Sequence, residues 1–141
     1  LDVLERRRAK LGDAHGETLS SVRLLARLWI AVGRAHEAQC LLAPFERLAR
    51  SRLPAAEPRH LGIFLQLQGE ALVARRDRAL LPEAEAKLLE AHAVFERLSG
   101  AQHEDTQKCV RAIVALYAAW EELEPGGRRG APRLPWEQRL E

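Results

Sequence analysis

The chain has 141 residues, 22 of them basic and 20 acidic, and a formal net charge of +2 at neutral pH. That length suffices for one domain with a real core, and the near balance of charges excludes nucleic-acid binding driven by bulk charge alone. Alanine, leucine, glutamate and arginine, all good helix formers, dominate the composition. Because alternating apolar and polar runs are missing, the sequence predicts an all-α fold without a sheet.

The cellular setting is predicted from the apolar runs and the cysteines. No apolar run reaches the roughly 18 residues that a membrane-spanning helix needs, and no signal peptide is visible. Cys40 and Cys109 each lie inside an apolar helical run, so we expect both thiols to be reduced and buried and the protein to be cytoplasmic. Because the sequence has no methionine and begins at Leu1, we also expect it to be a fragment of a longer protein.

Helical patterns follow one another along most of the chain, divided by glycines and prolines. Their apolar residues recur at three- and four-residue steps, which is typical of helices with one buried face. Gly12, Gly33 and Gly100 stand where glycine commonly ends a helix, and Pro82 stands where a first turn tolerates proline. The predicted helices, in chain order, cover residues 1–12, about 17–32, from 35 to a loop at 53–58, about 59–76, 82–100 and about 104–123.

The last 18 residues differ in composition from the helical part. Residues 124–135 are rich in proline, glycine and arginine and predict a flexible linker. Residues 136–141 predict a short final helix, which we interpret as a cap for the exposed end of the preceding helices.

A motif of histidine and threonine occurs twice at one fixed spacing. His15 and His103 are 103 − 15 = 88 residues apart, Thr18 and Thr106 are 106 − 18 = 88 residues apart, and an apolar helical run follows each copy. This distance equals two units of about 44 residues, within the range typical of stacked helix pairs. One such pair cannot bury both of its faces, so residues 1–123 predict an α-solenoid of antiparallel helix pairs.

The repeated unit resembles the tetratricopeptide repeat of the kinesin-light-chain type, as found in the C-terminal regions of bacterial serine/threonine kinases. The matching positions are Leu11, Gly12, His15, Thr18, Leu25, Ala26, Leu28, Trp29, Gly33, Arg34, Glu37 and Ala38 in the first copy, and Glu85, Ala86, His103, Thr106, Leu116, Tyr117 and Trp120 in the last. The resemblance implies a right-handed superhelix in which helices approach closely at Ala26 and Gly69 and meet at Ala38 and Ala86. The middle unit departs, because Arg76 stands where a turn glycine is expected and the turn is longer.

The resemblance also implies a partner-binding groove, lined by the first helix of each pair. The positions that match it are Ser20, Arg23, Arg27, Ile30, Ile63, Gln66, Glu70, Val73, Lys108, Arg111, Ala115 and Ala118. Four cations against one carboxylate predict an acidic protein segment as the ligand. Exposed ion pairs contribute only about 0–1 kcal/mol each, so we expect Ile30, Ile63 and Val73 to anchor the partner.

Two alternatives to this groove stay open. The charged helix face could be solvated without any ligand, in a chain that serves as an architectural spacer or self-associates through its open ends. The segment 134–137 also resembles the tryptophan-bearing acidic peptides that kinesin-light-chain grooves bind, so the tail could occupy its own groove. Between that role and the cap, we favour the cap.

One short pattern in the sequence approaches that of a catalytic metal site. His36 and Cys40, with Glu37 between them, nearly match the zinc-protease pattern, but Cys replaces its second histidine. No third ligand is evident and structural zinc usually takes four, so we expect no metal or other cofactor. We interpret His15 and His103 as caps for free backbone groups of the helices that follow. No nucleophile paired with a base emerges, so we expect no enzymatic activity.

Overall fold

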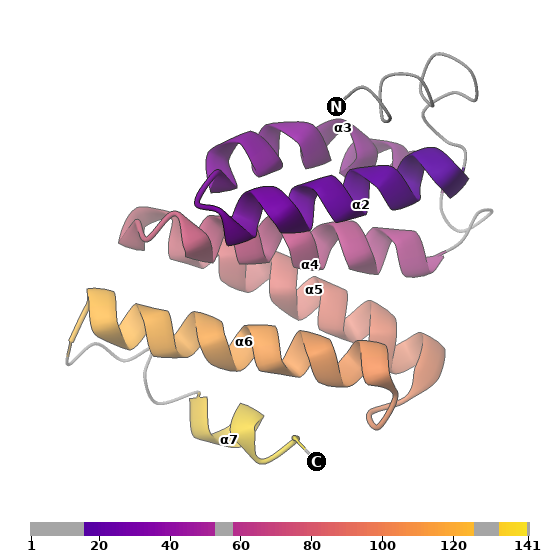
Figure 1. Ribbon diagram of the computed structural model, residues 1–141. Coiled ribbons are helices and arrows are strands. Elements are labelled where there is room, and N and C mark those ends of the chain that lie inside the picture. Colours follow the sequence, from indigo (N-terminus) through magenta and orange to yellow (C-terminus); the bar gives the residue numbers. More distant parts are fainter. Residues whose placement is uncertain (1–15, 53–57, 126–132, 141) are drawn as a thin grey trace.

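The computed structural model describes residues 16–52, 58–125 and 133–140 (Figure 1). In these ranges every regular element is helical, which confirms the all-α prediction for this part of the chain. The elements are α2 (Gly16–Ala31), α3 (Ala35–Arg52), α4 (Pro58–Ala74), the 3₁₀ turn η1 (Arg78–Leu80), α5 (Leu81–Ser99), α6 (Glu104–Leu123) and α7 (Arg133–Glu137). None of these helices is both long and apolar enough to cross a membrane.

Most helix ends lie within two residues of their predicted positions. Gly33 and Gly100 follow α2 and α5 with φ of 87° and 89°, a backbone conformation that glycine adopts without steric cost. The predicted final helix begins earlier than expected, at Arg133 rather than residue 136, and ends at Glu137. The predicted helix 1–12 and most of the predicted loop and linker lie outside the described residues.

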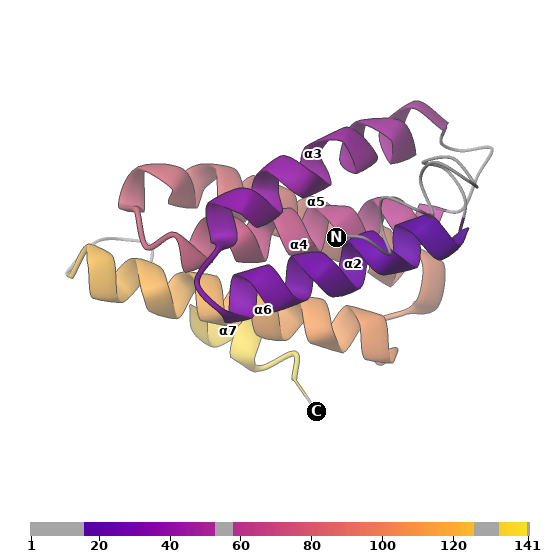
Figure 2. The same ribbon diagram turned by 45° about the horizontal axis from the view of Figure 1, so that its top comes forward.

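Helix α4 lies at the centre of the arrangement. It contacts α2, α3, α5 and α6, and Figures 1 and 2 show the other helices placed around it, with α7 against α6. Every residue from Leu61 to Gly69 is buried, which agrees with the wide apolar pattern of this segment. The core therefore includes Phe64, Leu65 and Leu67 of α4 at 0–1 % exposure.

Two glycines allow α4 and α5 to pack closely. A Cβ atom at Gly69 would lie 2.5 Å from Cγ of Leu88, and one at Gly62 would lie 2.9 Å from the ring of Phe95. The close approach predicted at Gly69 is therefore confirmed. Side chains larger than hydrogen would push these helices apart.

The prediction for Ala86 at this helix contact is wrong. Ala86 is exposed, whereas Ala84 is fully buried. The carbonyl oxygen of Ala84 would be 3.4 Å from a Cβ atom at Gly69. The reason is helical register, because Ala84 and Leu88 are four residues apart and share one face of α5. Ala38 of α3 is buried as expected.

The turn after α4 shows how the chain accommodates a residue other than glycine. Arg76 has φ of 56°, in the left-handed region that disfavours side chains. Asp77 then caps η1, since its carboxylate accepts a hydrogen bond from the amide of Ala79 at 2.9 Å. This 3₁₀ turn accounts for the extra length of the loop that distinguishes the middle unit.

The loop before α6 explains the second histidine–threonine motif. His103 is the N-cap of α6, and its Nδ1 accepts a hydrogen bond from the amide of Asp105 at 3.1 Å. The hydroxyl of Thr106 donates to the carbonyl of Gly100 at 2.7 Å, which closes the loop on itself. The capping role predicted for His103 is confirmed, and His15 lies outside the described residues.

The two cysteines differ in environment. Cys109 is fully buried, as expected, and burial raises the pKa of its thiol from 9.0 to about 12. Cys40 is exposed, so the prediction that it is buried is wrong. It lies on α3 at a position that faces away from α2 and α4, where the core-facing set is Ala38, Leu42 and Phe45.

Gly69→Ala is expected to destabilise the fold by about 1–3 kcal/mol, because the new methyl group would overlap Leu88. Urea unfolding followed by circular dichroism measures the change. The combined Gly69→Ala, Leu88→Ala variant should lose less stability than the sum of the two single variants, because the smaller side chain removes the overlap. Additive losses would contradict a steric contact between these positions.

Candidate functional site

The predicted groove residues come from three helices that are alternate in the chain. Arg23 and Arg27 are one turn apart on α2, and Gln66 and Glu70 are one turn apart on α4, so each pair shares a helix face. Helices α2 and α6 both contact α4. Side chains on the facing sides of α2 and α6 therefore meet over α4.

Two adjoining depressions lie where these three helices meet. The first has a volume of about 50 Å³ and is lined by Arg23, Arg27, Arg59, Ile63, Gln66, Phe95, Asp105 and Lys108; we call it the arginine pocket. The second, of about 320 Å³, is lined by Arg27, Gln66, Glu70, Lys108, Arg111, Ala112 and Ala115. Because both share Arg27, Gln66 and Lys108, they form one continuous surface, which we call the basic groove.

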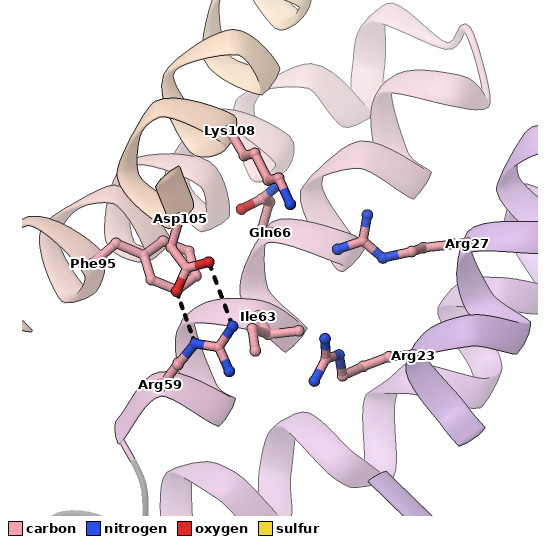
Figure 3. Close-up of a pocket in the computed structure, with 8 residues that line it drawn as sticks. All are labelled: Arg23, Arg27, Arg59, Ile63, Gln66, Phe95, Asp105 and Lys108. Atoms are coloured by element: carbon pink, nitrogen blue, oxygen red, sulfur yellow. Dashed lines mark hydrogen bonds and ion pairs between the residues drawn. The ribbon is translucent and has the colours of Figure 1, made fainter. Parts of the chain in front are cut away.

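One ion pair holds two walls of the arginine pocket together. Nε of Arg59 on α4 donates to Oδ2 of Asp105 on α6 at 2.7 Å, and its Nη2 lies 3.4 Å from Oδ1 (Figure 3). The hydrogen bond from Arg59 lowers the pKa of Asp105, so this carboxyl is ionised at neutral pH. The two-pronged contact fixes the orientation of the Arg59 guanidinium.

The opposite wall carries two arginines without such a partner. Figure 3 shows Arg23 and Arg27 reaching from α2 toward α4 and α6. Nε of Arg23 is covered from solvent and has no hydrogen-bond partner among the residues that the structure describes. Burial lowers the pKa of Arg23, and the neighbouring charges of Arg59 and Arg27 lower it further. A covered donor without an acceptor is costly, so this wall of the pocket favours an added anion.

The far end of the basic groove contains a half-buried carboxyl group. Glu70 receives a weak hydrogen bond from Nε2 of Gln66 at 3.5 Å. Burial raises the pKa of Glu70, and the Gln66 contact and the charge of Arg27 only partly oppose that effect. Burial of this carboxyl therefore opposes its ionisation, and the charge of Arg27 favours it.

The structure brings together most of the residues that the sequence predicted for the groove. Those that line it are Arg23, Arg27, Ile63, Gln66, Glu70, Lys108, Arg111 and Ala115. Ile30 and Val73 instead pack against the core, Ser20 is exposed on α2, and Ala118 is half-buried on α6. Of the three predicted apolar anchors, Ile63 alone lines these two depressions, and it is 6 % exposed.

The sequence did not lead us to expect Arg59, Asp105 and Phe95 in the lining of the groove. Arg59 and Asp105 are 46 residues apart and occupy the first turns of α4 and α6. The sequence contains one signal for this ion pair, because Arg59 and Asp105 are oppositely charged and occupy equivalent positions of neighbouring predicted repeats. Phe95 has no such signal, since it belongs to α5 and reaches the pocket only because Gly62 leaves room for its ring.

The tail packs against helices α5 and α6. The ring of Trp136 meets His92 of α5 edge to face at 4.9 Å, and the guanidinium of Arg139 lies 4.3 Å from the Trp136 ring. The carbonyl of Arg139 accepts a hydrogen bond from Nε2 of Gln107 at 3.0 Å. Burial lowers the pKa of His92, so its ring is neutral at neutral pH. These contacts agree with a covering role for Trp136, and they lie apart from the basic groove.

The pattern on α3 that resembles a zinc-protease motif places His36 and Cys40 on one helix face, but two side chains do not make a complete set of zinc ligands. Sγ of Cys40 is 3.9 Å from Nε2 of His36. Glu37, the would-be general base of that pattern, is paired with Arg34. Within the described ranges, no group of three or more histidine, cysteine or acidic side chains could hold a metal ion.

No match to this chain is found among protein-family models, curated proteins or solved structures. The resemblance to tetratricopeptide repeats therefore depends on the sequence positions alone.

Glu70→Gln is expected to raise the free energy of unfolding at pH 7 more than at pH 4. Burial raises the pKa of Glu70 in the folded state above its usual value, so the contribution of this group to stability is largest when it is protonated and is lost as pH rises. Urea titrations at the two pH values measure the difference, with Glu83→Gln on the exposed side of α5 as the matched control. A gain that is equal at both pH values would contradict the raised pKa.

Proposed function

We propose that this chain is a tetratricopeptide-like α-solenoid segment that binds an acidic segment of a partner protein in the basic groove. The solenoid hypothesis is supported by the order of packing, because each helix from α2 to α7 contacts the next one in the chain. It is also supported by the lining of the groove, which comes from the alternate helices α2, α4 and α6. Such a stack presents successive first helices on one face.

The excess of cations in the groove carries the proposal for an acidic ligand. Arg23, Arg27, Arg59, Lys108 and Arg111 line the groove, against the two carboxylates of Asp105 and Glu70. Asp105 is already bound to Arg59, and Lys108 lies 3.1 Å from the exposed Glu104. Arg23 and Arg27 have no ion pair within the described part of the chain. A partner carboxylate would supply the acceptors that these two side chains lack.

The groove is expected to bind through charge more than through apolar contact. Ile63 and Phe95, the apolar residues of the arginine pocket, are nearly covered. The apolar lining of the second depression is two alanines, Ala112 and Ala115. Exposed ion pairs contribute only about 0–1 kcal/mol each. Binding should therefore be fast, modest in affinity and strongly weakened by salt.

A reducing compartment fits the free thiol on the surface. Cys40 is exposed and unbonded, and such thiols persist where glutathione keeps them reduced. We therefore propose a cytoplasmic location.

Replacing Arg23, Arg27 and Arg111 with glutamate is expected to abolish binding of an acidic peptide library at low salt, while helicity stays unchanged. Fluorescence anisotropy with degenerate Asp/Glu-rich peptides measures binding, and circular dichroism measures helicity. The matched control reverses three exposed arginines outside the groove, Arg47, Arg78 and Arg97, which gives the same change in net charge. Equal loss in both triple variants would show that overall charge, not the groove, attracts the peptides.

Self-association is a second candidate, favoured by an exposed apolar stripe on α2. Leu24 and Leu28 of α2 and Val32, directly after its last residue, are 70 %, 56 % and 60 % exposed. They recur every four residues, and the amide of Val32 still donates to the carbonyl of Leu28 at 3.0 Å, so they share one face. A second copy of the chain could cover this stripe and make the protein a spacer that assembles with itself.

Sedimentation velocity over a range of concentrations tests this candidate. If the stripe is the contact, the wild type forms a dimer that Leu24→Lys with Leu28→Lys abolishes. Leu98→Lys, at a 44 % exposed leucine of α5, should leave the dimer intact. A monomer at every concentration would exclude this second function.

A further inference from the structure

The arginine pocket concentrates positive charge at one point of the groove. Four cationic side chains line it, Arg23, Arg27, Arg59 and Lys108, against the one carboxylate of Asp105. The formal charge of these groups is 4 − 1 = +3. Lys108 also lies 3.1 Å from the exposed carboxylate of Glu104. A partner carboxylate with one negative charge would still leave part of the remaining excess uncompensated.

The pocket is also organised before any ligand arrives. Asp105 holds Arg59 through two contacts of 2.7 Å and 3.4 Å. Nε of Arg23 is covered without an acceptor, and its guanidinium reaches into the pocket beside that of Arg27 (Figure 3). Donors fixed by packing in this way lose little freedom when an anion binds.

The dimensions distinguish a small group from an extended ligand. The pocket volume of about 50 Å³ accommodates a compact anion, since one water needs about 10–15 Å³. The pocket opens into the second depression of about 320 Å³, with Arg111 and Ala115 along its side. A free anion would leave that second depression empty, whereas a peptide could place one side chain in the pocket and its main chain beyond it.

We infer that the arginine pocket binds one phosphorylated serine or threonine side chain of the partner segment. The inference rests on the proposed function and names the chemical group that the groove selects. A phosphate monoester carries a charge near −2 at neutral pH and three acceptor oxygens. Arg23 and Arg27 donate to it from α2, and Arg59 and Lys108 face it from α4 and α6. Guanidinium groups bind phosphate oxygens in pairs, so two or more arginines suit this group better than they suit a lone carboxylate.

The test compares three degenerate peptide libraries that differ only in a fixed central residue: phosphoserine, glutamate or serine, each with the same acidic flanks. Fluorescence anisotropy gives the dissociation constants for the wild type, Arg23→Gln and the control Arg97→Gln, an exposed arginine of α5 outside the groove. Phosphoserine is expected to bind about tenfold more tightly than glutamate, as gaining one hydrogen bond between charged groups implies. Arg23→Gln should abolish that preference and Arg97→Gln should keep it.

Each other outcome has a distinct meaning. Equal binding of the phosphoserine and glutamate libraries would overturn this inference and leave the proposed function intact. No binding of any library would overturn both. A single-stranded oligothymidylate that binds as tightly as the phosphoserine library, and in an Arg23-dependent way, would replace the phosphorylated side chain with a nucleic-acid backbone as ligand.

Inorganic phosphate provides a second measurement that needs no peptide. In nuclear magnetic resonance spectra of the ¹⁵N-labelled protein, phosphate should shift the Nε–H signals of Arg23 and Arg59, whereas chloride at matched ionic strength should not. The shift at Arg59 should disappear in Arg23→Gln if both side chains hold one anion. Equal shifts with phosphate and chloride would contradict a phosphate-selective pocket.

Discussion

The close packing of α4 among its neighbours is the constraint on which the rest of the structure depends. The run from Leu61 to Gly69 is buried throughout, and α4 contacts four other long helices. Such burial requires small residues where backbones approach, which Gly62 and Gly69 provide toward α5. Because α2 and α6 both pack on α4, the cations on their facing sides are held over the same helix. The basic groove is a consequence of that packing.

Burial and charge act against each other at this groove. The same packing that brings Arg23 close to α4 removes water from its Nε without supplying an acceptor, and it raises the pKa of Glu70 on the neighbouring helix. Arg59 avoids this cost because Asp105 pairs with it. A covered polar group without a partner calls for an explanation such as a bound ion, which is the physical reason for proposing an anion at the Arg23 side of the pocket.

Helix positions and most of the groove lining could be predicted from the sequence, because apolar periodicity and glycine positions depend on local chemistry. The 88-residue spacing relates Arg23 to Arg111 (111 − 23 = 88), and the resemblance to tetratricopeptide repeats predicted that both line one groove with Gln66. The wrong predictions concern residues whose burial is decided by helix register or by contacts between helices. Ala86 was predicted at the helix contact because Glu85 and Ala86 match Glu37 and Ala38 of the first copy, whereas the register of α5 buries Ala84. Cys40 was predicted in the core because its neighbours are apolar, although its face of α3 is exposed. Phe95 could not be predicted as pocket lining, since its position depends on the space beside Gly62.

Native-state hydrogen exchange, resolved residue by residue, tests most directly whether α4 supports the groove. We expect the amides from Leu61 to Leu72 to exchange slowest, with an opening free energy equal to that of global unfolding, and the amides of α2 and α7 to exchange through smaller, local openings. If the amides of α4 exchange as fast as those of α2, then α4 is not the common support of the facing helices.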